Sequence, residues 1–327
     1  MAATVPVVGH QLRLAVAEES TWGTAVTRDR SIRPISANLE RMVGKDPREY
    51  LLHSAGSRNH FGHVRTEDNA GGTVSSELRY EGDGMLLYYG FGAVTTTGPS
   101  GGLYTHTYKL SLAPPTGMTM EQIVYEQQTP GYLSEVFEGC LVAKTTINLK
   151  VKKNVTMDLD IIAETSGGMQ GTVTSTSTAP FTTNDVPMLF NQAGTFTYNS
   201  VALNVTSATI VIDHALERRT NLGALTTAKP VGGRQSVTMS VDLEWDASTM
   251  DTALTVDTEA AVSIVLTGTG SRTATFAATK AYVVSCSRPI NSAGLIKQSA
   301  SLVFETDGSN EGLTLAIVNT LSSGKGV

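Results

Sequence analysis

Strict alternation of apolar and polar residues is the feature that most constrains this sequence. In residues 146–151 and 155–161, every second side chain is apolar: Ile147, Leu149, Val151, Val155, Met157, Leu159 and Ile161. A period of two places one face of a β-strand in a core and leaves the other in water. The two segments therefore predict a half-buried antiparallel hairpin.

The short connection between these segments predicts the register of the hairpin. A three-residue loop over residues 152–154 ends in an asparagine, which tolerates a positive φ. This loop sets Leu149 opposite Met157 and Val151 opposite Val155, and it keeps one face wholly apolar. A two-residue turn would set Val151 opposite Thr156 and mix the two faces.

Similar runs recur along the chain, separated mostly by clusters of Gly, Pro, Asn and Ser; they cover residues 73–80, 205–212, 236–245, 260–266, 281–286 and 296–304. This layout is typical of an all-β protein. A helix is predicted over residues 83–91, with Asp83 as its N-cap and Gly90 and Gly92 closing it. Residues 248–254 predict a shorter helical turn in the second half.

A segment of Gly, Ser, Thr and Ala at residues 167–180 marks a domain boundary. We expect two tandem β-sandwich or barrel units, each with one short helix, since 327 residues suffice for two cores. The units span residues 1–170 and 191–327, with a Ser/Thr-rich linker at 171–190. Residues 42–72 and 95–130 are predicted to be long binding loops, the second with a strand at 104–112.

The two halves resemble each other in sequence. Residues 36–41 match 213–218, and both contain Leu-Glu-Arg; the other matches pair 74–81 with 239–246, 144–147 with 285–288, and 155–164 with 296–305. Any two β-domains share alternation, so coincidence is the competing interpretation. The shared helix position and the Leu-Glu-Arg triplet favour a duplication, which would let three chains form a ring of six similar units.

Charge and hydropathy narrow the possible partners. The net charge is −6 with scattered basic residues, which disfavours tight binding to nucleic acid. No run of eighteen apolar residues occurs, and residues 1–10 lack the pattern of a signal peptide, so we expect a soluble, unexported protein without a membrane partner. Cys140 and Cys286 lie in apolar runs and are expected to be buried thiols.

The sequence holds no motif of an enzyme or of a nucleotide-binding protein. Asp158 and Asp160 share one face of a strand, and this face is more simply the polar side of a hairpin than an acid–base pair. His53, His60 and His63 could form a transition-metal site, but histidines in a polar loop without a fourth nearby ligand are more often solvated or partner-facing. We expect no enzyme activity, no cofactor and no metal.

Four segments together resemble one family. They are Glu-Ser-Thr-Trp-Gly-Thr at residues 19–24, the strand-to-helix segment 80–90, Gly139-Cys140 followed by the hairpin 144–163, and the stretch 194–222. In this order they resemble the tail tube proteins, or major tail proteins, of long-tailed phages. The short connection at residues 222–232 departs from the long one in the first half and puts the equivalence of the two halves' contacts in doubt.

The resemblance implies a structural virion protein. It implies trimeric rings stacked into a hollow tail tube through which DNA passes to the host without specific binding. Partners implied are further copies, a tape measure protein, a tail terminator and a distal tail protein, and synthesis would take place in the host cytoplasm.

On that interpretation, the polar side of the hairpins lines the channel; the residues expected there are Asn148, Lys150, Thr156, Asp158, Asp160, Lys297, Ser299 and Ser301. The alternative is a carbohydrate-binding or adhesive β-sandwich of a virion or cell surface. It needs exposed aromatic residues, but these make up only 6% of the chain, and Trp245 falls in a predicted core strand.

Overall fold

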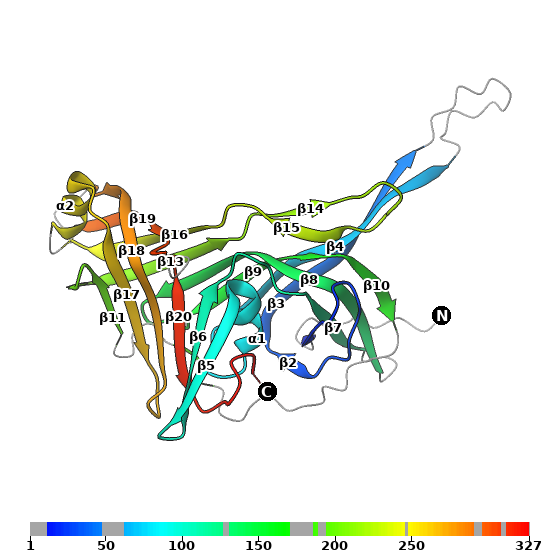
Figure 1. The fold of residues 1–327 in the computed structure, drawn as a ribbon, viewed down its shortest axis with the longest axis horizontal. Helices are drawn as coiled ribbons and strands as arrows, with labels where there is room; N and C mark the ends of the chain where they lie inside the picture. The colour runs from blue at the N-terminus through cyan, green and yellow to red at the C-terminus, as the bar shows by residue number, and fades with distance from the viewer. Residues whose placement is uncertain are drawn as a thin grey trace.

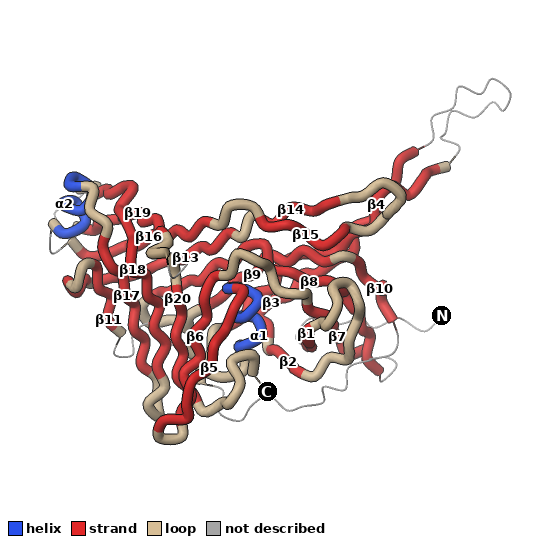
Figure 2. The backbone as a smooth tube through the Cα atoms, viewed as in Figure 1, coloured by secondary structure: helices blue, strands red, loops and turns tan. Residues whose placement is uncertain are grey.

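The computed structural model describes residues 12–47, 62–126, 131–170, 186–188, 194–245, 248–290, 296–308 and 312–326. Strands dominate these residues, and two short helices accompany them (Figure 2). The all-β expectation is confirmed, and so is one short helix in each half. The sheets do not close into a barrel, so the sandwich form of the expectation applies.

The first half carries these elements: β1 (Leu12–Glu18), β2 (Arg30–Ile32), β3 (Pro34–Pro47), β4 (His63–Glu77), α1 (Gly84–Phe91), β5 (Gly92–Ser100), β6 (Leu103–Leu110), β7 (Met118–Glu126), β8 (Gly131–Lys150), β9 (Thr156–Ala163) and β10 (Thr165–Gln170).

The second half carries these: β11 (Thr195–Tyr198), β12 (Val201–Leu203), β13 (Val205–Asp213), β14 (Leu216–Arg219), β15 (Ala228–Gly232), β16 (Ser236–Glu244), α2 (Thr249–Val256), β17 (Ala260–Thr267), β18 (Thr273–Ser287), β19 (Lys297–Glu305) and β20 (Thr314–Asn319).

One antiparallel sheet runs through both halves (Figure 1). Its first four strands follow the order β3-β4-β9-β8, and its next four follow β13-β16-β19-β18. The strands of the two sets are connected along the chain in the same order. In each set, a short helix lies in the connection between the second and third strands along the chain, β4 and β8 or β16 and β18. The pairing of β8 with β13 joins the sets, so the halves share this sheet.

Two long strands, β8 and β18, each belong to two layers. The first part of β8 pairs with β7 and β10, and its last part pairs with β9 and β13. Likewise, β18 pairs first with β17 and β20 and then with β19. The second layers are therefore β2-β1-β7-β8-β10 and β12-β11-β17-β18-β20-β6-β5, and the last two strands of the second come from the first half. Two sheets that share a bent strand form a sandwich with a core between them.

The helix α1 closes the core of the first half. It is apolar on most sides, and its buried residues are Met85, Leu86, Leu87, Tyr89, Gly90 and Phe91. A helix that is apolar nearly all round is stable only inside a core. Asp83 occupies the N-cap position as predicted, but its carboxylate accepts a hydrogen bond from the Arg79 backbone N–H (2.9 Å) and makes no capping hydrogen bond to α1. Gly92 ends the helix with φ of 106°, a conformation that favours glycine.

The central hairpin forms as predicted, but its register is shifted by two residues. Ile147, not Leu149, lies opposite Met157, and the positive φ of the turn falls at Lys152 (62°). The cause is a tertiary contact, since the Val155 N–H donates to the Met188 carbonyl (2.8 Å) and so cannot pair with Val151. A shift of two residues preserves the faces, and the predicted apolar residues are buried except Val151, which is 37% exposed.

The two predicted long loops are largely strands. The segment 42–72 contains the ends of β3 and β4, which form a hairpin that projects from the body (Figure 1), and residues 48–61 lie outside the described part. The segment 95–130 contains most of β5 together with β6 and β7. Residues 42–47, 62–67 and 95–102 are largely exposed on both faces, so they show no apolar alternation, whereas residues 105–110 of β6 alternate in burial and residues 117–121 are buried on both faces. The division at residues 171–190 stays a prediction, since most of that segment is outside the described residues.

Candidate functional site

The residues predicted to form a polar surface lie on one face of the shared sheet. One cross-strand row runs from β9 to β19 through Thr156, Asn148, Thr209, Ser240 and Ser301. A row two residues away runs from β8 to β19 through Lys150, Ser207, Asp242 and Ser299. Residues directly opposite each other share a face, as do residues two apart on a strand. The structure thus brings candidates from both halves onto one surface.

The three remaining candidates lie on the same surface. Asp158 lies opposite Thr146, Asp160 opposite Lys144, and Lys297 opposite Glu244. Among all eight candidates, the exposed ones are Lys150, Asp160, Lys297, Ser299 and Ser301, and the half-buried ones are Asn148, Thr156 and Asp158. We call this surface the polar face.

The reverse side of the same strands belongs to the core. Ile147, Met157 and Leu159 are fully buried, and Leu149 is 1% exposed. Burying each such side chain contributes about 1.5–3 kcal/mol, so the sheet cannot turn this side to water. The expectation of which side of the hairpin is wet is therefore confirmed.

Hydrogen bonds tie the half-buried part of the polar face together across four strands. The Asp158 carboxylate accepts from the Ser75 hydroxyl and from Asn148 Nδ2, the latter at 2.9 Å. The Asn148 side-chain oxygen in turn accepts from Thr209 Oγ1 at 3.3 Å. These bonds fix the rotamers of Asp158 and Asn148, so this part of the surface is ordered without a ligand.

A second cluster surrounds Asp242 in β16. Its carboxylate accepts from Ser299 Oγ at 2.6 Å and from Ser207 Oγ at 2.8 Å. These hydrogen bonds, together with the charge of Lys297, hold the pKa of Asp242 below its usual value. Asp242 is therefore a fixed negative charge on the polar face.

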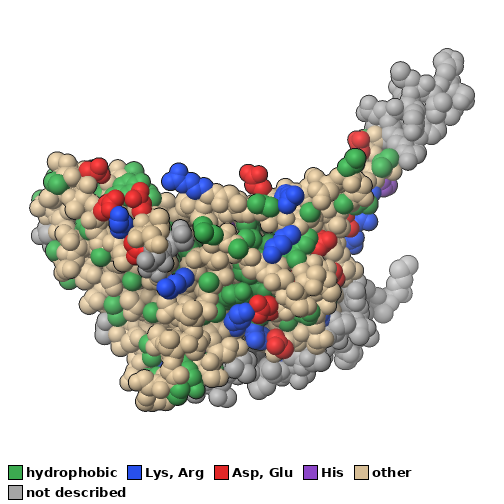
Figure 3. Space-filling model, in the orientation of Figure 1, with side chains coloured by type: hydrophobic (Ala, Val, Ile, Leu, Met, Phe, Trp, Pro, Cys, Tyr) green, Lys and Arg blue, Asp and Glu red, His purple; other side chains and the backbone are tan. Residues whose placement is uncertain are grey.

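Charges of both signs alternate on this surface. Asp160 and Glu244 each have a lysine directly opposite, namely Lys144 and Lys297. Basic and acidic side chains are likewise scattered on the face of the molecule drawn in Figure 3, without a broad patch of either sign. Mixed charge of this kind disfavours tight binding of a polyanion, which relies on clustered basic groups.

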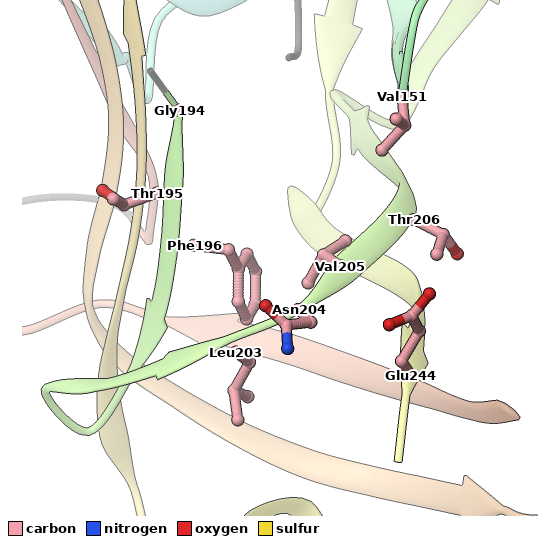
Figure 4. Close-up of a pocket in the computed structure, with 9 residues that line it drawn as sticks. All are labelled: Val151, Gly194, Thr195, Phe196, Leu203, Asn204, Val205, Thr206 and Glu244. Atoms are coloured by element: carbon pink, nitrogen blue, oxygen red, sulfur yellow. The ribbon is translucent and has the colours of Figure 1, made fainter. Parts of the chain in front are cut away.

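A groove of about 440 Å³ opens at one end of the shared sheet (Figure 4). Its walls come from β11, β12, the start of β13 and the end of β16, with Val151 from the β8–β9 turn. Phe196, Leu203 and Val205 form its apolar part, and Glu244 and Thr206 face each other on its polar side. The groove is shallow and open, so it does not exclude water as a catalytic pocket does.

Comparison with known protein families decides the identity. The family model described as phage tail tube protein matches residues 9–306, nearly the whole chain. The chain belongs to the phage tail tube protein family. A comparison with curated proteins found no match. The family resemblance expected from the sequence is confirmed, and the chain is a component of the virion tail.

Tail tube proteins are structural. The histidine, cysteine and carboxylate side chains that the structure describes are consistent with that role. The residues that the structure describes contain no group of three or more His, Cys, Asp or Glu side chains placed to hold a metal ion. His63 is exposed on β4, and His53 and His60 lie outside the described residues. No helix in the described part of this tail tube protein is long and apolar enough to cross a membrane.

The predicted burial is correct for Cys140, only partly correct for Cys286, and wrong for Trp245. Cys140 is fully buried, and burial raises the pKa of its thiol. Cys286 is only half-buried and accepts a hydrogen bond from Gln298 Nε2 at 2.9 Å. Trp245 is 38% exposed at the end of β16, with Arg288 4.9 Å above its ring, so its assignment to the core is wrong. The strand ends there, and alternation no longer governs burial.

Sequence reasoning missed half of the polar face. Ser75 of β4, Thr209 of β13 and Asp242 of β16 belong to it as much as the eight predicted residues do. Their strands were predicted, and the alternation gave their polar sides. The missing information was which strands pair, above all the joining of β8 to β13, which lie about sixty residues apart in sequence.

Proposed function

We propose that this tail tube protein forms rings of three chains, and that the rings stack into the hollow tube through which phage DNA is delivered to the host. The observation that carries the proposal is the junction between β8 and β13 inside one chain. There, seven consecutive residue pairs, from Ser207 with Lys150 to Asp213 with Lys144, join two four-stranded sets of equal connectivity. An internal duplication accounts for this likeness.

The edges of the shared sheet support assembly with further copies. Within the described residues, β3 pairs with β4 alone, and residues 282–287 of β18 pair with β19 alone. In the first half, the strand that corresponds to β18 is β8, and it pairs with β13, the counterpart of β3. Pairing β18 of one chain with β3 of the next would repeat the internal junction and leave no open edge in a closed ring.

Exposed apolar side chains lie beside both open edges. Ile35 in β3 is 59% exposed, Val284 in β18 is 51% exposed, and Ile290, just beyond β18, is 72% exposed. On the corresponding strand of the internal junction, Ile210 and Ala208 are buried. Burial of these side chains between chains would contribute about 1.5–3 kcal/mol each.

The polar face is proposed to line the channel of the tube. A continuous ring sheet has one face toward the outer layers, and only the polar face is free of them. Its carboxylates repel passing phosphates, and opposed carboxylates partly neutralise its lysines, so DNA would meet little net attraction. We propose no catalytic activity and no cofactor. The ends of the tube would bind a tape measure protein, a tail terminator and a distal tail protein.

Negative-stain electron microscopy and native mass measurement test the assembly. We expect hollow tubes, and a ring mass equal to three chains of 34.6 kDa. A ring of six chains would contradict the trimer and leave the tube in place. Single particles at all concentrations would contradict both.

The channel assignment has a separate test, the double variant Asp158→Lys and Asp160→Lys. Asp160 is exposed, but Asp158 is half-buried and accepts two hydrogen bonds, so the double variant should cost about 1–3 kcal/mol and tubes should still form. These tubes should bind double-stranded DNA in a salt-dependent manner, measured by co-sedimentation. The matched control is Asp29→Lys with Glu259→Lys, which makes the same charge change away from the polar face. Equal DNA binding by both variants would contradict the channel assignment.

A further inference from the structure

The chain contains two corresponding hairpins in very different surroundings. In the second half, β14 and β15 form a hairpin between β13 and β16. In the first half, residues 41–47 of β3 and 63–67 of β4 form a hairpin in the corresponding place. We call this hairpin the arm. The β14–β15 hairpin lies along the first half, whereas the arm projects away from the body (Figure 1).

The contacts of the β14–β15 hairpin define a docking site on the first half. The guanidinium of Arg218 donates to the carbonyl of Ala70 in β4 (2.5 Å) and to that of Ala163 at the end of β9 (3.2 Å). The Asp68 N–H donates to the Leu225 carbonyl at 2.9 Å. Thr227 is buried against Asn69 and donates to its side chain. The site therefore consists of the start of the buried part of β4 and the end of β9.

The second half has an open groove at the corresponding position. The residues before and at the start of β16 correspond to this part of β4, and the end of β19 corresponds to the end of β9. A groove of about 550 Å³ lies there; its wall residues from these two segments are Gly233, Arg234, Gln235, Ser236, Val237, Val303, Phe304, Glu305 and Thr306. Its rim carries Leu112, which is 82% exposed. In the first half, this place is covered by a hairpin.

The arm has the apolar side chains that such a groove requires. Met42 and Val43 of β3 are 42% and 38% exposed, and Val64 of β4 is 43% exposed. The arm also carries Arg41, which the matching Leu-Glu-Arg triplets place in correspondence with Arg218. Inside its own chain, Arg41 forms an ion pair with Asp68 at 2.8 Å.

We propose that the arm of one copy docks into the groove between β16 and β19 of the neighbouring copy, in the way that β14–β15 docks on the first half of its own chain. This inference rests on the proposed ring. The arm cannot reach the groove of its own chain, because β4 and β19 are five strand spacings apart, about 24 Å, and the arm points away (Figure 1). A head-to-tail contact of this kind closes into a ring.

Site-specific photocrosslinking of the full-length protein tests the contact. A photoreactive amino acid replaces Met42 in the arm, and the assembled protein is irradiated and digested. Mass spectrometry of a mixture of isotope-labelled and unlabelled chains identifies crosslinks between copies. We expect the crosslinked peptides to contain residues 233–237 or 303–306. The control is Leu222, an apolar and even more exposed residue on the connection of the β14–β15 hairpin, which should give no crosslink to that groove.

Two charge substitutions test whether the contact stabilises assembly. Val64→Asp on the arm and Leu112→Asp on the groove rim should each lower the association constant about tenfold or more, measured by sedimentation velocity. Leu222→Asp should leave it unchanged. Each variant should keep the thermal stability of the single chain, since all three side chains are exposed.

The outcomes separate this inference from the ring itself. Rings whose Met42 crosslinks fall on another surface overturn the arm contact and leave the ring proposal intact. Chains that remain single at all concentrations overturn both proposals. Rings that form with equal affinity in the Val64→Asp and Leu222→Asp variants also overturn the arm contact.

Discussion

The strands β13 and β3 hold the same place in their halves. β13 is hydrogen-bonded to a strand on each side, whereas within the described residues β3 is paired on one side only. Pairing with β8 and β16 leaves Ile212 of β13 fully buried, whereas its sequence counterpart, Ile35 of β3, is 59% exposed. In the proposed ring, a single chain completes one junction of the sheet and a neighbouring copy completes the other. Stability inside the chain and affinity between chains would then depend on corresponding residues.

The largest expected effect comes from truncating the covered strand. Ile212→Ala should lower the free energy of unfolding by about 2–5 kcal/mol, because it leaves a cavity in the core. Ile35→Ala should change that free energy by less than about 0.5 kcal/mol and instead weaken assembly. Urea denaturation of the unassembled protein measures both. Similar losses of stability in the two variants would break the comparison.

A smaller effect is expected at the two corresponding arginines. Arg218→Ala removes the donors to two carbonyl groups under the β14–β15 hairpin and should cost about 1–3 kcal/mol. Arg41→Ala removes an ion pair with an arginine side chain that is 33% exposed, and should cost at most about 1 kcal/mol. Thermal denaturation of both variants beside the wild type gives the order. If Arg41→Ala lowers thermal stability more than Arg218→Ala does, the β14–β15 hairpin is not held to its own chain more firmly than the arm is.

The halves should also differ in their response to acid, because His214 in the second half has Ala37 as its sequence counterpart. His214 Nε2 lies 2.9 Å from the Gly90 carbonyl, and its Nδ1 lies 3.1 Å from Gln235 Nε2. This arrangement suits a neutral ring that donates from Nε2 and accepts at Nδ1. Burial lowers the pKa of His214 below its ordinary value of 6.5.

The sign of the pH effect follows from that lowered pKa. The unfolded chain binds the proton more readily, so His214 makes stability fall as pH drops below about 6.5 toward the folded pKa. His214→Gln should reduce the loss of stability between pH 7.5 and pH 5.5. Urea denaturation of the wild type and the variant at both pH values isolates the effect, because the two proteins share all other titrating groups. An unchanged pH dependence would contradict it.

The smallest effect is expected on the polar face, where the halves are alike. Ser299→Ala should cost about 1 kcal/mol or less, because Asp242 keeps its bond from Ser207 and remains accessible to water. It should also raise the pKa of Asp242 toward its ordinary value, which an NMR titration measures. An Asp242 pKa that stays at its wild-type value in this variant would contradict the role given to the Ser299 hydrogen bond.

The sequence determined the strands with clear apolar alternation, their faces and the short helices, but not the strands in residues 42–72 and 95–103 and in β7. Alternation in residues 146–161 and 236–244 fixed which side chains are buried, since a period of two assigns each residue to a face whatever strand lies beside it. The helix at residues 84–91 followed from a compact apolar run between glycines. For the same reason, all eight predicted polar residues lie on one surface.

Only the tertiary structure decided which strands pair and in which register. The hairpin register shifted by two residues because Val155 pairs with Met188, a contact between distant segments. Likewise, the joining of β8 to β13, the exposure of Trp245 and the projection of the arm depend on neighbours that no local pattern specifies. Backbone hydrogen-bonding groups are alike in every residue, so the sequence marks the face of a strand far more strongly than its partner.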